Sequence, residues 1–390
     1  MKTIKIILRI LIYLAIFALA GFCFLLYYFT KNDFQPLPVT NLSVENKSRI
    51  RPADSNALTF ITWNIGYCGL NRDMDFFYDG GKKVRPDEIT FQKNLNGVFG
   101  FLSDNDSVNF IFLQEVDSFA KRSYFTNQMK LFSKALADYS SSFATNYNVP
   151  FVPMPLLSPM GQVVSGIATF SGFLPYKCER YSYPLNYPWP MKLFLLDRCF
   201  MLQRYKLSSG NKELVLINLH NSAFDDADLL RQYETWMLRG FLLNEYEKGN
   251  YVIVGGDWNQ NPPKYRKLTF GGGFKKNNST PIISSDYLPE NWNIAYDSTL
   301  PTNRDVHEGY VHGKTPTTIY DFFITSPNVI VEQVNVINCG FEFSDHQPVY
   351  MRVKLDTDPL SGCFSDVKNN VTILQDSIIK LNERIYPGKK

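Results

Sequence analysis

The stretch YVIVGGDWN, residues 251–259, joins a short apolar run to a polar tip. An uninterrupted apolar run of this length, rich in β-branched residues, is typical of a strand that is buried on both faces. Two glycines follow the run, and Asp257 and Asn259 come next. In an α/β sheet, ligand-binding side chains gather beyond the carboxyl ends of such strands. The stretch therefore predicts a central strand that carries Asp257 and Asn259 into a cleft.

Comparable runs occur on both sides of this stretch. Strands are predicted at 58–65, 110–116, 167–173, 193–207, 213–220, 319–326 and 331–339, and helices at 86–102, 127–139 and 225–246. Polar residues lie within or beside several of these strands, namely Asn64, Glu115, His220 and Asp321. Near the end of the chain, Asp345 and His346 stand just before the residues 348–350. The mixture of strands and helices predicts an α/β protein, in which polar residues at strand ends can converge in one cleft.

The types of these polar residues indicate a particular chemistry. Asn, Asp and Glu offer hard oxygen donors, which suit Mg²⁺ and suit zinc poorly. A histidine beside an aspartate can be held in one tautomer or kept protonated. Each element alone also fits a structural role, such as an ordinary turn at 256–259 or a buried histidine at position 220. Together, and without a motif for a nucleophilic Ser or Cys, they indicate metal-assisted attack of water on a phosphate ester.

The order of these elements resembles that of the endonuclease/exonuclease/phosphatase superfamily over residues 58–355. The matching motifs are TWNIG (62–66), FLQEVD (112–117), GIATFSGF (166–173), LINLH (216–220), VGGDWNQ (254–260), IYDFFITS (319–326) and SDHQPV (344–349). The resemblance implies a four-layer α/β sandwich of two packed mixed β-sheets flanked by helices. It also implies a metal-dependent phosphoric ester hydrolase, with Mg²⁺ as the expected cofactor and Mn²⁺ or Ca²⁺ as alternatives.

The resemblance further implies roles for the residues at the strand ends. Glu115 looks like the principal metal ligand, helped by Asn64 and Asp345. Asp257 would orient or deprotonate the attacking water. Asn259 would hold the phosphate.

Two histidines complete this implied site. His346, paired with Asp321, would stabilise the transition state or assist the leaving group. His220 would contact a non-bridging phosphate oxygen. Because charge develops on phosphate oxygens during such a reaction, a metal and two histidines would supply electrostatic stabilisation.

Residues outside the motifs are candidates for binding the substrate. Lys82 and Arg85 lie in a loop between the first two motifs and could meet phosphate, or form a solvated basic turn. Arg198 lies within the predicted strand pair that leads to His220 and is a candidate phosphate contact. Trp189, in the aromatic and proline-rich segment 181–198, could contact a lipid or a base, or serve in packing.

The amino-terminal segment predicts a membrane anchor. Residues 10–29 contain no charge, and twenty helical residues span ~30 Å, the thickness of a bilayer's hydrocarbon core. Basic residues precede the segment, so the N-terminus is expected inside and the rest of the chain outside the cytoplasm. Two alternatives remain open: a cleaved signal peptide, with the small residues Ala18 and Ala20 near the cleavage site, or a lipoprotein signal at Cys23.

Four parts are predicted: a membrane anchor at 1–31, a linker at 32–57, a catalytic domain at 58–356, and a tail at 357–390 with an amphipathic helix. The composition, 45% hydrophobic and 20% charged, excludes a disordered chain. Residues 1–31 carry four basic and no acidic side chains, so the net charge of +3 becomes −1 in the remainder. That balance gives no general attraction for long polyanions.

The leading hypothesis is a membrane-anchored phosphodiesterase or phosphomonoesterase, sphingomyelinase-like, that acts on a phospholipid head group or another small phosphoester. One alternative is an extracytoplasmic nuclease of the DNase or RNase type, so nucleic acid is not excluded as a substrate. A second is a catalytically inactive, membrane-tethered binding module. The sequence predicts no protein partner.

Overall fold

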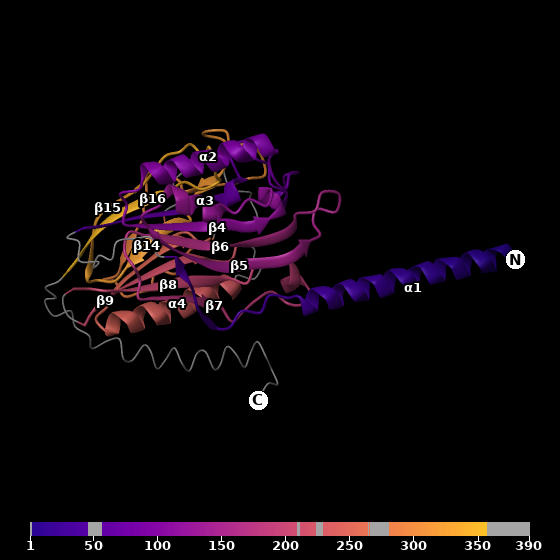
Figure 1. Cartoon of the computed structure of the whole chain (residues 1–390), viewed down its shortest axis with the longest axis horizontal. Helices are drawn as coiled ribbons and strands as arrows, with labels where there is room; N and C mark the ends of the chain where they lie inside the picture. Colours follow the sequence, from indigo (N-terminus) through magenta and orange to yellow (C-terminus); the bar gives the residue numbers. More distant parts are fainter. Residues whose placement is uncertain are drawn as a thin grey trace, which may run out of the picture.

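The computed structural model describes residues 2–45, 57–208, 211–223, 229–263, 265 and 281–356. Two mixed β-sheets of seven strands each form the body of the protein (Figure 1). The first residues of the helix predicted at 225–246, up to 228, and the predicted tail helix at 357–390 lie outside the described residues.

The first sheet has the strand order β1-β7-β8-β9-β10-β14-β11. Its strands are β1 (Val39–Asn41), β7 (Lys177–Ser182), β8 (Cys199–Lys206), β9 (Glu213–His220), β10 (Tyr251–Asp257), β14 (Asp321–Thr325) and β11 (Asn293–Ala295). Strands β9 and β10 are parallel, and the other pairs are antiparallel. The stretch 251–257 is therefore a central strand, as its continuous apolar character predicts.

The second sheet has the order β15-β16-β3-β4-β6-β5-β2. Its strands are β15 (Val329–Val336), β16 (Val349–Leu355), β3 (Leu58–Asn64), β4 (Phe110–Ala120), β6 (Gly161–Ser171), β5 (Ser140–Val152) and β2 (Val44–Glu45). Here β3 and β4 are the parallel pair. A separate ribbon pairs β12 (Asn303–Arg304) with β13 (Thr317–Thr318).

The sheets pack face to face, with helices on their outer faces. Phe60 and Phe112 of one sheet meet Ile253 of the other in the core between the sheets. Helices α2 (Glu88–Asp104) and α3 (Gln128–Ala135) cover β3, β4 and β6, and α4 (Leu229–Glu247) covers the first sheet. Alternate residues of β3 face the other sheet and α2, which explains why the neighbours Phe60 and Ile61 are both apolar and buried. The predicted four-layer sandwich is confirmed.

The amino-terminal helix α1 (Lys2–Lys31) projects away from this body (Figure 1). The segment 3–31 is long and apolar enough to cross a membrane, and none of its most apolar stretch is buried against the body. By length and composition, α1 is a possible membrane span or signal sequence. Residues 39–45, assigned from the sequence to a linker, instead add an edge strand to each sheet, β1 beside β7 and β2 beside β5.

The strand predicted at 193–207 is wrong in its first half. Only residues 199–206 form β8, whereas Met191–Phe194 forms a 3₁₀ turn, η4. The segment between them, residues 195–198, is not part of β8 and includes two charged residues. Its backbone bonds elsewhere: the N–H of Asp197 donates to the backbone oxygen of Asn146 on β5, and the backbone oxygen of Arg198 accepts from the N–H of Tyr183. The sequence prediction also missed β5 and β7. Their polar and charged residues interrupt the apolar pattern, and pairing with neighbouring strands decides their conformation.

Gly256 allows β10 to run beside β9. Its φ is +147°, and a Cβ there would lie 2.1 Å from the backbone oxygen of Leu219. We therefore expect Gly256→Ala to lower the free energy of unfolding by about 3 kcal/mol, since strand backbone rather than a flexible side chain must move. Gly100→Ala, in α2 with open space around its Cβ, should stabilise by about 0.5–1 kcal/mol. Urea unfolding measures both, and equal midpoints would contradict this backbone conformation.

Candidate active site

The carboxyl ends of the parallel strands bring the predicted polar residues together. In the first sheet, Asp257 is in register with His220 on β9 and with Asp321 on β14. In the second sheet, Asn64 ends β3 beside Gln114 of β4. Asn64 also donates a hydrogen bond to Asp257, with its Nδ2 2.9 Å from Oδ2. The candidate site thus spans both sheets at one edge of the sandwich.

An irregularity in β4 directs Glu115 into this site. The pairing of β4 with β6 shifts register between Leu113 and Val116, and Glu115 has a φ of +55°. A bulge of this kind redirects a side chain and is common beside active sites. Left-handed backbone at a non-glycine residue costs about 1–3 kcal/mol and is maintained only where the surrounding structure enforces it.

Asn64 connects two carboxylates that would otherwise repel each other. Besides Asp257, its Nδ2 donates to Oε1 of Glu115 at 3.3 Å. Its side-chain oxygen accepts from the backbone N–H of Gly66 at 3.0 Å. A cation binds an amide through oxygen, so Asn64 can be a metal ligand only if its amide group turns over.

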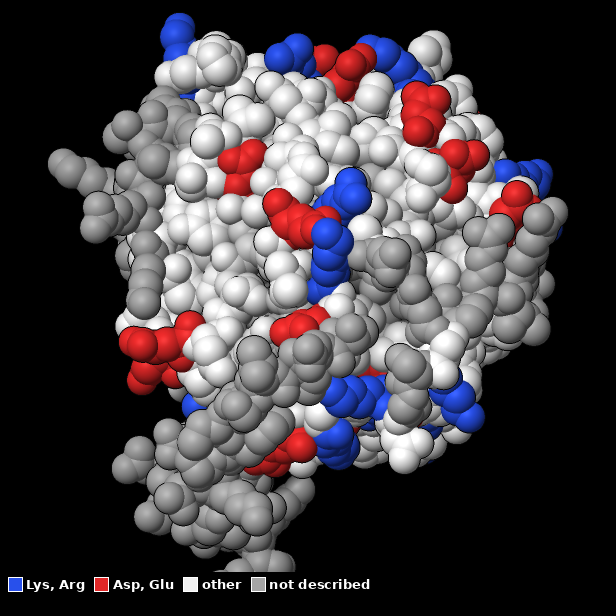
Figure 2. Space-filling model, turned by 90° about the vertical axis from the view of Figure 1, so that its left-hand side faces the viewer, with Lys and Arg blue, Asp and Glu red and all other residues white. Residues whose placement is uncertain are grey.

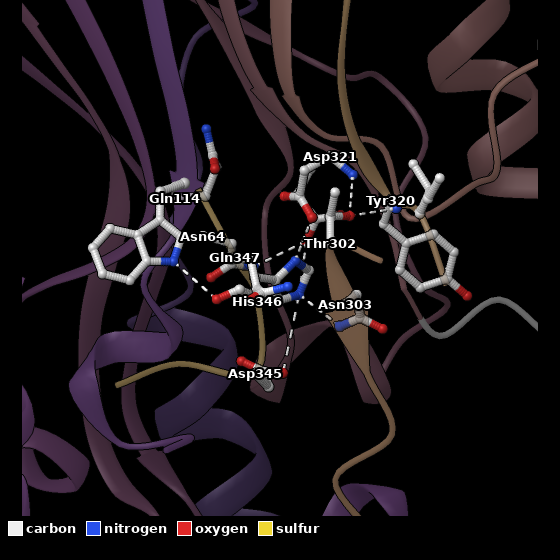
Figure 3. Close-up of polar contacts among 12 residues, drawn as sticks. Asn64, Gln114, Thr302, Asn303, Tyr320, Asp321, Asp345, His346 and Gln347 are labelled. Carbon is white, nitrogen blue, oxygen red and sulfur yellow. Dashed lines mark hydrogen bonds and ion pairs between the residues drawn. The ribbon is translucent and has the colours of Figure 1, made fainter. Parts of the chain in front are cut away.

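His346 lies at the centre of the hydrogen-bonded group in Figure 3. Its Nδ1 is 2.7 Å from Oδ2 of Asp321, and its Nε2 is 3.7 Å from Oδ2 of Asp257. The backbone oxygen of His346 accepts a hydrogen bond from Trp63 Nε1 at 3.0 Å. These contacts fix the ring between two buried carboxylates. The predicted pairing of His346 with Asp321 is present in the structure.

The ionisation of this group follows from burial and charge. Burial raises the pKa of Asp257 to about 6, and the neighbouring His346 limits the rise. Burial disfavours the charged form of His346, but the surrounding carboxylates, Asp321 foremost, hold its pKa well above its ordinary value. Near neutral pH, the arrangement therefore places an ionised carboxylate beside a protonated imidazole.

His220 differs from His346 in its charge. Burial lowers the pKa of His220 well below its ordinary value, and the positive charges of Arg198 and His346 act in the same direction. His220 is therefore neutral, and its 3.5 Å approach to Asp257 is not an ion pair. Its Nε2 also lies 4.0 Å from Glu115, so this nitrogen faces the carboxylates of the site.

The oxygen donors around Glu115 fit a divalent cation. The Glu115 side chain keeps 23% of its surface exposed, whereas that of Asp257 is 1% exposed. Burial and the negative charge of Glu115 raise the pKa of Asp345 to about 6. A cation bound between these two carboxylates would offset their mutual repulsion. A Cβ on Gly66 would come within 2.8 Å of Asp345 Oδ1, so glycine keeps the space beside that carboxylate open. Carboxylate oxygens in an open position suit Mg²⁺.

A second group of side chains could also hold a metal. Ligand atoms of Asp257, Asp321 and His346 lie within 4.8 Å of one another. Oδ1 of Asp321 has no hydrogen-bond partner among the residues that the structure describes. However, Nδ1 of His346 pairs closely with Asp321, and a protonated imidazole cannot bind a metal. We therefore favour the oxygen donors around Glu115 over this group.

The remaining predicted residues lie at different distances from this centre. Asn259 follows β10 with a φ of +50°, and its Nδ2 donates to the backbone oxygen of Asn221. Arg198 is buried, and its Nη1 donates a hydrogen bond to the backbone oxygen of His220 at 3.4 Å. Both are therefore beside the site.

Lys82 and Arg85 line a pocket of about 540 Å³ together with Asn71, Asp73, Asp87 and Ser158. The guanidinium of Arg85 is already engaged, since it donates to the backbone oxygen of Lys121 and lies over the Tyr124 ring. Trp189 is 55% exposed, and its Nε1 donates to Thr30 at the end of α1. The structure therefore places Trp189 against the amino-terminal helix rather than among the site residues.

Sequence reasoning missed three residues of the site. Nδ2 of Asn303 lies 2.9 Å from Nε2 of His346, on the side opposite Asp321. Thr302 Oγ1 accepts hydrogen bonds from the backbone N–H groups of Tyr320 and Asp321, which fixes the start of β14. Arg304 is buried, and its backbone N–H donates to the backbone oxygen of Asp345 at 3.0 Å. The TNR sequence at 302–304 carries no strand-end pattern that would have identified them.

Comparisons with known proteins place the fold. No family model and no curated protein sequence matches this chain. Among solved structures, the endonuclease/exonuclease/phosphatase from Beutenbergia cavernae DSM 12333 is 15% identical, with a TM-score of 0.53 over 79% of this chain and 74% of its own. ANGEL2, a 2′,3′-cyclic phosphatase in complex with adenosine-2′,3′-vanadate, is 12% identical, with a TM-score of 0.51 over 81% of this chain and 99% of its own.

Proposed function

We propose that this chain, which has the endonuclease/exonuclease/phosphatase fold, is a metal-dependent phosphoesterase. The observation that carries the proposal is the cluster of Asp257, Asp321 and His346, in which a buried carboxylate and a buried imidazole of opposite charge face each other at 3.7 Å. In such a pair, the carboxylate can accept a proton from water, and the imidazole can donate a hydrogen bond to the phosphoryl oxygen on which negative charge develops. The phosphate-ester chemistry of ANGEL2, which shares the fold, supports the same class of reaction.

The residues of this chain have separate roles in the proposed reaction. Asp257, ionised above pH about 6, would take a proton from the attacking water. Its Oδ1 already accepts from the backbone N–H of Asn259 at 2.9 Å, whereas its Oδ2 faces Asn64, His220 and His346. Asn259 would bind the phosphate. Because Asn259 is only two residues from Asp257, the phosphate would then lie close to the carboxylate of Asp257.

The two histidines would stabilise the charge on the phosphoryl oxygens. His346, kept protonated by Asp321, would donate through Nε2 to an equatorial oxygen or to the leaving group. In that state Asn303 must present its amide oxygen, because both imidazole nitrogens are donors. Neutral His220 would donate a hydrogen bond to a non-bridging oxygen through Nε2 without competing for the proton of Asp257.

Glu115, with Asp345 and Asn64, would hold a divalent cation, expected to be Mg²⁺ with Mn²⁺ or Ca²⁺ as alternatives. When bound, the ion supplies Lewis-acid polarisation of a phosphoryl oxygen. We expect EDTA to abolish hydrolysis of bis(p-nitrophenyl) phosphate by the full-length protein, and Glu115→Gln to raise the Mg²⁺ concentration that gives half-maximal rate by about tenfold or more. Glu290→Gln, on the surface, is the matched control. Activity that persists in EDTA would overturn the proposed mechanism.

The proposed substrate is a phospholipid head group or another small phosphoester, held near a membrane by α1. The negative net charge outside α1 supports this choice over long polyanions. Figure 2 shows the end of the body opposite α1, where acidic and basic side chains are interspersed rather than grouped by sign. The alternatives are an extracytoplasmic nuclease and an inactive tethered binding module. Assays with plasmid DNA, RNA, sphingomyelin and phosphoinositides separate these three.

We further propose that α1 is a membrane anchor with its N-terminus inside and the catalytic domain, residues 58–356, outside the cytoplasm. The exposed apolar surface of α1 and the basic residues that precede its apolar part support this topology. A secreted protein or a lipoprotein, formed by cleavage within α1, is the alternative. Cell fractionation with amino-terminal sequencing distinguishes an intact anchor from a cleaved signal.

A further inference from the structure

The active site and the base of α1 lie at the same end of the sandwich. Strand register establishes this arrangement, because Leu219, next to His220, pairs with Phe200 at the start of β8. The segment that joins β7 to β8 therefore crosses the site end of the first sheet. Its 3₁₀ turn η4 contacts α1 directly, with the Phe194 and Phe29 rings 5.1 Å apart.

Two further contacts hold the end of α1 on this segment. Trp189 Nε1 donates to Thr30 Oγ1 at 3.2 Å, and Lys192 Nζ lies 2.6 Å from Asp33 Oδ2. Trp189 nevertheless remains 55% exposed. A bilayer crossed by α1 would consequently begin close to this segment, and an exposed tryptophan is suited to the interface between lipid and water.

A β-hairpin extends from the second sheet beyond the site. Gly166 of β6 pairs with Val116, which directly follows Glu115. The hairpin continues to the pair of Val152 with Gly161, five residues farther along β6. At ~3.3 Å per residue, its end lies ~16 Å past the level of Glu115. In Figure 1 this hairpin loop projects at the end of the body from which α1 leaves.

The tip of this hairpin is apolar and exposed to solvent. The sequence FVPMPLLSPM at 151–160 places four large apolar side chains outside the core. Phe151 is 41%, Met154 47%, Leu156 80% and Leu157 101% exposed. A contiguous exposed apolar patch on a soluble surface marks an interaction site, since each such side chain is stabilised by about 1.5–3 kcal/mol on leaving water.

Polar groups lie behind the tip. The pocket lined by Lys82 and Lys83 also includes Ser158 of the hairpin loop. Lys121 Nζ donates to the backbone oxygen of Pro159 at 3.3 Å. Apolar residues at a tip with basic residues at its base match the order of layers in a bilayer surface, where acyl chains lie beneath phosphate-bearing head groups.

The geometry points to insertion of the 151–160 loop into the surface of the bilayer that α1 spans, so that the active site faces this bilayer. The occupant is lipid rather than a protein, because the loop projects from the same end of the body as α1, whose segment 3–31 is apolar enough to cross a membrane and has none of its apolar stretch buried against the body (Figure 1). The consequence for catalysis rests on the proposed function: a phosphoester in that bilayer would reach the site without leaving the membrane surface.

The position of the loop can be measured without any assay of activity. We would attach an environment-sensitive nitrobenzoxadiazole probe at Leu157→Cys in the full-length chain, with Cys23, Cys339 and Cys363 changed to serine, and reconstitute it in phosphatidylcholine vesicles. We expect blue-shifted emission and quenching by spin-labelled lipid. The matched control is Ile330→Cys, an exposed apolar site (50%) on β15 at the opposite end of the body. Equal, water-like emission from both probes would overturn the inference.

A second measurement links the loop to turnover. The double variant Leu156→Glu with Leu157→Glu should hydrolyse sphingomyelin in vesicles at least about tenfold more slowly, because apolar transfer energy is lost, while hydrolysis of bis(p-nitrophenyl) phosphate stays unchanged. Ile330→Glu should change neither rate. If the double variant acts normally on both substrates, the inference fails. If the wild-type chain hydrolyses no phosphoester, the proposed function fails, and the probe experiment still decides the position of the loop.

Discussion

Asp257→Asn is expected to reduce kcat for a soluble phosphodiester by about 10³-fold, because the variant lacks the proton acceptor for the attacking water. Asparagine has nearly the same shape, and its side-chain oxygen can still accept from the backbone N–H of Asn259, as Oδ1 of Asp257 does at 2.9 Å. The variant should therefore fold and retain its substrate KM within a few-fold. Stopped-flow or steady-state release of p-nitrophenol measures both quantities.

The pH dependence of the wild-type rate provides an independent test of this role. The acceptor must be ionised, and burial raises the pKa of Asp257 to about 6. The rate should therefore rise with pH up to about 6 and level off above it, and this acidic limb should disappear in Asp257→Asn. Asp286→Asn, a substitution of the same kind at an exposed carboxylate, should leave the rate and its pH profile unchanged. A rate within tenfold of wild type in Asp257→Asn would remove Asp257 from the proposed role.

Asp321→Asn is expected to reduce kcat by about 10²-fold or more and to change the alkaline side of the pH profile. Among the charges acting on His346, the carboxylate of Asp321 contributes most to holding its pKa above the ordinary value. Without that negative charge, the imidazolium loses its proton at lower pH. The alkaline limb of the rate should therefore move to lower pH, since donation to the phosphoryl oxygens needs the protonated ring.

A purely structural role for Asp321 would lower activity without moving this limb. Asp305→Asn is a useful control, because it removes a carboxylate from the partly exposed pair of Asp305 with His307. It should leave the pH profile unchanged. An Asp321→Asn variant with an unshifted alkaline limb would show that His346 is not the group whose protonation the reaction needs.

Much of the fold was accessible from sequence because burial leaves a direct record in it. The run at 251–254 is apolar at consecutive positions, which is expected of a strand covered on both faces. The strand at 58–64 has apolar residues on both of its faces, and both strands lie in the interior of their sheets. The N-terminal segment 10–29 was identified by a different feature, the length of its uncharged apolar run. By contrast, polar residues interrupt the apolar pattern within β5 and β7, and the conformation of these strands depends on partners that are distant in the sequence.

The candidate site divides in the same way. Residues that end or begin an apolar run, such as Glu115, Asp257 and His220, were identifiable because a polar residue there interrupts a recognisable pattern. Asn303 and Arg304 belong to a two-residue strand without such a pattern. The prediction that Trp189 lies at the substrate could not anticipate its contact with Thr30, since those residues are far apart in the chain.

The sequence by itself determined the chemical inventory of this protein: oxygen donors and histidines at the ends of buried strands, preceded by a helix that can span a bilayer. Only the tertiary structure decided which of them meet and with what charge. Asp321 and His346 are 25 residues apart, yet lie 2.7 Å from each other in a buried site. The physical reason is that pKa values and hydrogen bonds depend on distance and burial, which strand pairing and the packing of the two sheets set across long sequence separations.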